Sequence, residues 1–72
     1  MSCYPNLVSD IKKALTPKEW QVVSYYVTVA EITGKTNQIS IARRALENAI
    51  AVAMSNNMEK AAKKISEYLQ FY

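Results

Sequence analysis

Leu15-Thr16-Pro17-Lys18-Glu19-Trp20 is the stretch that decides the fold, because three separate signals for the start of a helix coincide there. Thr16 and Glu19 have the types and spacing of a capping box, in which each side chain accepts a hydrogen bond from the other residue's backbone N–H. Pro17 occupies the first helical position, and Leu15 and Trp20 occupy the hydrophobic staple positions. A helix should therefore begin at residue 17, and the helix before it should end by Thr16.

Apolar residues at helical spacing extend this assignment to the whole chain. Asn6 is expected to cap the first helix, and Gly34 to end the second in the left-handed conformation. Asn56 is expected to cap the fourth helix, with Glu59 at its third position. The sequence thus predicts one small all-α domain, a compact bundle of about four helices at residues 6–15, 17–33, 38–55 and 57–70.

Two parts of this assignment have alternatives. Residues 22–29 are rich in β-branched and aromatic residues, so propensity alone favours a strand there. We expect a helix, because the cap at Thr16 precedes the run and the chain has no second strand-like segment to pair with it. Helices three and four could also fuse into one rod, because the chain has no strong helix breaker after Gly34.

The predicted second helix is apolar around almost its whole circumference. Such a helix is either central to the core or shared with a partner. We expect Trp20 and Tyr26 in the core.

Composition excludes several classes of function. The chain has no histidine and scattered carboxylates, so we expect no enzyme activity, no metal site and no cofactor. Gly34-Lys35-Thr36 resembles the end of a phosphate-binding loop, but Val29 stands where that loop needs a glycine. Cys3 is the only cysteine, and we expect a reduced thiol. No apolar run approaches the roughly 20 residues of a membrane span, so we expect a cytoplasmic protein without a membrane partner.

The net charge of +3 lies entirely in the second half of the chain. Residues 1–34 carry three lysines and three acidic residues, whereas residues 35–72 carry six basic and three acidic residues. This asymmetry favours a polyanionic partner.

Two motifs resemble helix-turn-helix DNA-binding domains of the quorum-sensing-regulator and sigma-factor type. The opening of the second helix, residues 15–23, is similar to their Leu-Thr-Pro-basic-Glu sequence, and Ile41-Ala42-Arg43-Arg44 resembles part of their scaffold helix. Val52 stands eleven positions after Ile41, where that family has a recognition-helix valine, and Asn48 would cap that helix. The turn differs from the family, because Ala45-Leu46-Glu47-Asn48 is a sequence that can remain helical.

The resemblance implies a small regulator that binds duplex DNA, with the second helix or the C-terminal aromatic residues forming a homodimer contact. Base edges would be read by uncharged polar side chains, while basic side chains would contact phosphates. The implied nucleic-acid-binding residues are Lys35, Arg43, Arg44, Ser55, Asn56, Asn57, Lys60, Lys63 and Lys64.

The same residues have simpler explanations. Arg43 can pair with Glu47, and Lys63 lies four residues from both Glu59 and Glu67, as on a solvent-facing helix. The alternative function is a compact helical adaptor or inhibitor, of the kind that viruses and plasmids encode as accessory factors. Its exposed aromatic residues would bind another protein.

Overall fold

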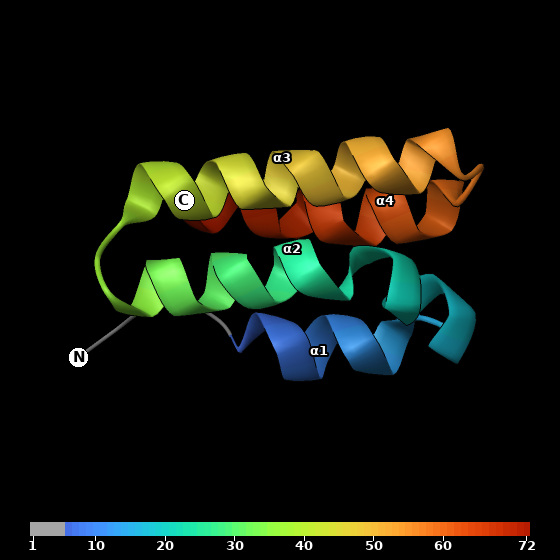
Figure 1. Cartoon of the computed structure of the whole chain (residues 1–72), viewed down its shortest axis with the longest axis horizontal. Helices are drawn as coiled ribbons and strands as arrows, with labels where there is room; N and C mark the ends of the chain where they lie inside the picture. Colours follow the sequence, from blue (N-terminus) through green and yellow to red (C-terminus); the bar gives the residue numbers. More distant parts are fainter. Residues whose placement is uncertain (1–5) are drawn as a thin grey trace.

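Four helices run antiparallel, up-down-up-down, along the long axis of the molecule (Figure 1). The computed structural model describes residues 6–72, so Cys3 lies outside the described residues. The elements are α1 (Leu7–Ala14), α2 (Pro17–Lys35), α3 (Ile39–Ser55), α4 (Glu59–Ser66) and a 3₁₀ turn, η1 (Glu67–Phe71). Residues 6–72 contain no strand, so the all-α prediction is confirmed and residues 22–29 are helical.

The predicted capping box at the start of α2 is present. The Glu19 backbone N–H donates to Thr16 Oγ1 over 3.2 Å, and the Thr16 N–H donates to Glu19 Oε1 over 2.9 Å. Leu15 and Trp20, the staple pair, are both half-buried against the core. Because both hydrogen bonds join residues only three positions apart, this start of α2 depends on local sequence alone.

The predicted role of Gly34 is wrong. It lies inside α2, which continues to Lys35, and it does not have a positive φ. The left-handed residue after the helix is Asn37, with a φ of 64°. Gly34 instead allows the Tyr72 ring to lie close to the backbone of α2, because a Cβ at this position would lie 2.8 Å from Cε1 of Tyr72. The C-terminal end of the chain therefore packs against the last turns of α2.

The third and fourth helices are separate, and the loop between them differs from the prediction. Asn56 ends α3 and donates from Nδ2 to the Val52 carbonyl over 2.8 Å, so it does not cap α4. Asn57 takes the left-handed conformation, with a φ of 59°, and Met58 precedes α4. The helix predicted over 57–70 is accordingly shorter, and its last turns are 3₁₀.

α3 is unbroken through residues 45–48, where the helix-turn-helix resemblance implies a turn. Asn48 therefore lies within a helix and does not cap one. Alanine, leucine and glutamate at 45–47 all have high helix propensity, which explains the continuity. α3 and α4 form an antiparallel hairpin (Figure 1).

The start of α1 is capped from a distant part of the chain. The Asn6 side chain makes no capping hydrogen bond, so that prediction is wrong. Glu31 of α2 accepts a hydrogen bond from the Val8 backbone N–H over 3.0 Å instead. Its negative charge lies at the positive end of the α1 dipole, which stabilises the helix and joins it to α2.

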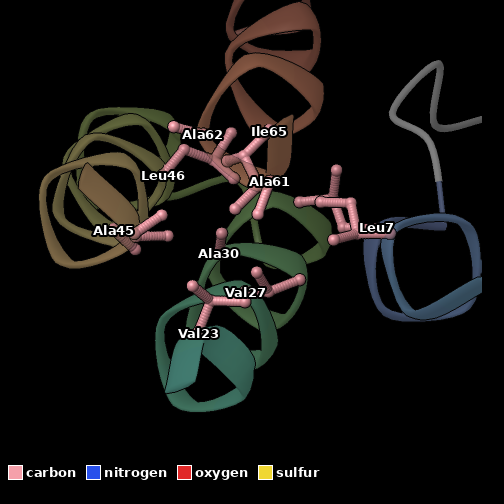
Figure 2. Packing of buried hydrophobic residues seen from close by; sticks show 12 residues of the cluster. Leu7, Val23, Val27, Ala30, Ala45, Leu46, Ala61, Ala62 and Ile65 are labelled. Carbon is pink, nitrogen blue, oxygen red and sulfur yellow. The ribbon is translucent and has the colours of Figure 1, made fainter. Parts of the chain in front are cut away.

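The core lies where the four helices meet (Figure 2). Its largest fully buried side chains are Leu7, Ile11, Leu46, Ile65, Val23 and Val27. Seven of the thirteen buried apolar residues in the described chain are alanines, and six of the seven are on α3 and α4. Small side chains let helices approach closely, so the inner face of α3 has little room for larger ones.

Candidate functional site

The residues implied for nucleic-acid binding do not converge on one surface. Lys35 lies at the end of α2 and pairs with Glu31, with Nζ 3.7 Å from Oε2. Arg43 pairs with Glu47 at 3.6 Å, as the spacing predicts, and also donates to the Leu69 carbonyl over 3.3 Å. Both cations are therefore engaged with groups of this chain.

The polar residues implied to read bases lie at the opposite end of α3, at the α3–α4 connection. Ser55 Oγ donates to the Ala51 carbonyl over 2.9 Å, and Asn56 Nδ2 donates to the Val52 carbonyl. These donors satisfy carbonyls at the end of their own helix. Asn57 supplies the left-handed backbone of the connection.

The lysines of α4 form a third group. Lys60 and Lys63 are exposed, and neither forms an ion pair with a carboxylate of residues 6–72. The pairing predicted for Lys63 is made by Lys64, whose Nζ lies 3.7 Å from Glu67 Oε1 and 5.9 Å from the Tyr68 ring centroid. Only Lys60 and Lys63 of this group project freely into solvent.

α2 has a second apolar face besides the one buried in the core. Its inner seam is Val23, Val27, Ala30 and Gly34, all buried. Its outer seam is Val22, Tyr25, Val29 and Ile32, with the alternating three- and four-residue spacing by which helices pack side by side. Tyr25 is 71% exposed and Ile32 57% exposed. The inner seam is therefore fully buried. On the outer seam, Val22 and Val29 are half-buried against the core, and Tyr25 and Ile32 remain exposed.

A groove between α2 and α3 adjoins this outer seam. We call it the α2–α3 groove; it has a volume of about 240 Å³ and is lined by Tyr25, Tyr26, Val29, Ile41, Arg44, Ala45 and Asn48. Ile41 on its α3 wall is 47% exposed. Tyr26 is half-buried against the core, as predicted, and its ring meets that of Tyr25 edge-on, with centroids 5.3 Å apart. Three of the five large exposed apolar side chains of the described chain thus gather on one side of the molecule.

Arg44 is the only charged residue that lines the α2–α3 groove. No carboxylate of residues 6–72 forms an ion pair with it. Four of the six carboxylates are engaged elsewhere: Glu19 in its capping box, Glu31 with Val8 and Lys35, Glu47 with Arg43, and Glu67 with Lys64. The other two, Asp10 and Glu59, are on α1 and α4. The groove therefore combines apolar walls with one uncompensated positive charge.

A second hollow, of about 290 Å³, lies at the α1–α2 connection. Leu15, Pro17 and Trp20 contribute its apolar part, and Lys12 and Gln21 its polar part. These are the staple residues that set the angle between the two helices. The packing of these staple residues at the start of α2 explains this hollow without a ligand.

Sequence reasoning identified α2 as apolar all round but did not single out Ile32 and Ile41 as surface residues. The 3–4–3 spacing of the outer seam was visible in the sequence. Nothing in that spacing distinguishes the seam that becomes buried from the one that remains exposed, because both have similar apolar content.

The described residues contain no helix with the length and hydrophobicity of a membrane span. They also contain no group of three or more carboxylate, thiol or imidazole side chains placed to hold a metal ion. Comparisons with known protein families, curated proteins and solved structures found no match to this chain.

Proposed function

We propose that this protein is a small helical adaptor or inhibitor that captures a helix of another protein in the α2–α3 groove. The observation that carries the proposal is a pair of large apolar side chains on the outer seam of α2, Tyr25 and Ile32, which the bundle leaves exposed on the side of the molecule that also carries exposed Ile41. Monomeric proteins rarely leave large contiguous apolar patches exposed without a binding role. Tyrosine is also among the side chains that contribute most to binding energy at protein interfaces.

The shape of the surface favours a helix as the bound element. An apolar groove between two helices accepts the apolar face of a third, with anchors at the same three- and four-residue spacing. On α3 the lining of the groove runs from Ile41 to Asn48, about two helical turns or roughly 12 Å, so it can hold a similar length of a bound helix. The bound helix would pack on α2 as α3 does.

Photo-crosslinking in the cells that make the protein tests this proposal. A benzophenone side chain at position 32, on the outer seam, should form an adduct with another protein. The same group at position 13, on the exposed side of α1, should not. Tyr25→Ser should abolish the adduct from position 32 but leave the bundle folded, because Tyr25 is 71% exposed. Equal labelling from both positions, or an adduct insensitive to Tyr25→Ser, would contradict the proposal.

DNA binding is the second candidate function. Lys60 and Lys63 support it, because they are exposed on α4 and unpaired with any carboxylate of residues 6–72. If the two lysines neutralise two phosphates, the logarithm of the DNA-binding constant should fall with the logarithm of the salt concentration with a slope of about −2. Binding of this kind does not depend on the base sequence. Fluorescence anisotropy with a short duplex at about 50 and 200 mM salt measures this slope. If the protein binds DNA through these lysines, the double variant with Lys60→Gln and Lys63→Gln should not bind the duplex. Tyr25→Ser should bind it as the wild type does. No binding at the lower salt concentration would exclude it.

A further inference from the structure

We infer that the α2–α3 groove selects an acidic amphipathic helix, whose apolar residues pack on Tyr25, Val29 and Ile41 and whose carboxylate pairs with Arg44. This inference rests on the proposed function and specifies the chemistry of the partner. Its basis is the charge of the groove: Arg44 is the only charged residue in the lining, and no carboxylate of the described chain pairs with it.

Arginine suits such a contact better than lysine would. Its planar guanidinium can bind a carboxylate through two parallel hydrogen bonds, which gives direction as well as attraction. Here it lies beside the apolar walls of the groove. A bound helix would exclude water from that site and strengthen the ion pair relative to one in open solvent.

A second residue extends the positive potential along the same path. Lys18 precedes Val22 on α2 by four positions, in line with the outer seam, and it is exposed. No carboxylate of residues 6–72 forms an ion pair with Lys18. A helix lying along the outer seam would therefore meet positive charge at Arg44 and at the Lys18 end, and no negative charge in the groove lining.

The same charges argue against a second copy of this chain as the occupant. A two-fold dimer interface places one surface patch against the same patch of the partner. Each copy would bring Arg44 and no groove carboxylate, so the interface would hold two positive charges and no negative charge from the groove. Like charges across an interface disfavour a partner. An acidic helix would instead bring negative charge to Arg44.

A displayed library of amphipathic helical peptides tests the inference with the full folded chain. Each peptide has about 18 residues, fixed leucines at positions i, i+3, i+4 and i+7, and Glu, Lys or Gln in equal proportion at the flanking positions. We expect selection on the wild-type chain to enrich Glu over Lys at one or more flanking positions. Arg44→Glu should weaken the selected acidic peptides about tenfold and invert the preference towards Lys.

Matched variants separate the groove from general electrostatics. Lys60→Glu makes the same change in net charge on α4, away from the groove, and should leave the selected peptides bound. Tyr25→Ser should abolish their binding, while circular dichroism confirms that all variants remain helical. The inference would be overturned if the selected peptides showed no preference for Glu, or if Arg44→Glu left that preference unchanged. It would also be overturned if Arg44→Glu and Lys60→Glu weakened peptide binding equally.

Three further outcomes identify which proposal fails. If the chain sediments as a dimer that Tyr25→Ser dissociates, the groove is occupied by a second copy and the acidic helix is overturned. Specific crosslinking from position 32, combined with a library that yields no acidic binders, would overturn this inference and leave the proposed function standing. Equal crosslinking from positions 32 and 13 would remove the proposed function itself.

Discussion

Leu46→Ala should lower the free energy of unfolding by about 3 kcal/mol, because it leaves a cavity in the centre of the bundle. Leu46 is fully buried on α3 and is one of the largest side chains in the core. A domain of this size has a total stability of roughly 4–11 kcal/mol, so the loss is a large part of the whole. The melting temperature should fall by roughly 15 °C.

Urea denaturation followed by circular dichroism measures this effect. Met54→Ala is the matched control, because Met54 is also a large apolar residue of α3 but is 52% exposed. Its cost should remain within about 0.5 kcal/mol. If Met54→Ala were as costly as Leu46→Ala, α3 would not turn its Leu46 face towards the core and its Met54 face towards solvent.

Ala49→Leu should destabilise the protein by about 1–3 kcal/mol for the opposite reason, overpacking. Ala49 is fully buried in the core cluster, on the alanine-rich inner face of α3. Three added carbon atoms would force the neighbouring helices apart or push side chains away from their preferred rotamers. Leucine and alanine have similar helix propensities, so the change reports packing rather than helix formation.

Ala51→Leu tests this explanation, because Ala51 is exposed two residues further along the same helix. We expect a change within about 0.5 kcal/mol. Both variants can be compared by thermal and urea unfolding. Equal destabilisation by the two leucines would show that the inner face of α3 is not closely packed.

The parts of the fold that sequence reasoning predicted correctly depend on residues close together in the chain. The capping box joins Thr16 to Glu19, three positions apart, and the helical assignment of residues 22–29 followed from that start. The Arg43–Glu47 ion pair spans one helical turn. Such interactions need no knowledge of which helices become neighbours.

Two of the incorrect predictions, those for Gly34 and Asn6, involve partners far away in sequence. Gly34 was expected to end α2, but the side chain that comes closest to it is Tyr72, at the far end of the chain. Asn6 was expected to cap α1, but the acceptor is Glu31, on another helix. Local propensity could not reveal either contact, because both depend on how the helices are packed.

The candidate site shows the same division. The sequence showed an excess of basic residues in its second half, and the helix-turn-helix resemblance implied that they contact DNA together. In the bundle, Lys35 and Arg43 pair with neighbouring carboxylates, whereas Lys60 and Lys63 lie on a different helix from Arg44. Charge counted along a chain does not specify where helices place it on the surface.

By itself, the sequence determined that this chain is helical and that a helix begins at Pro17, because caps, staples and turn-spaced pairs act within about four residues. The tertiary structure alone decided which of the two apolar seams of α2 is buried. The seam of Val23 and Val27 packs against the other helices, and the seam of Tyr25 and Ile32 remains exposed beside Arg44. The physical reason is that burial is a property of the whole bundle: two seams of similar hydrophobicity differ only in which neighbours pack against them.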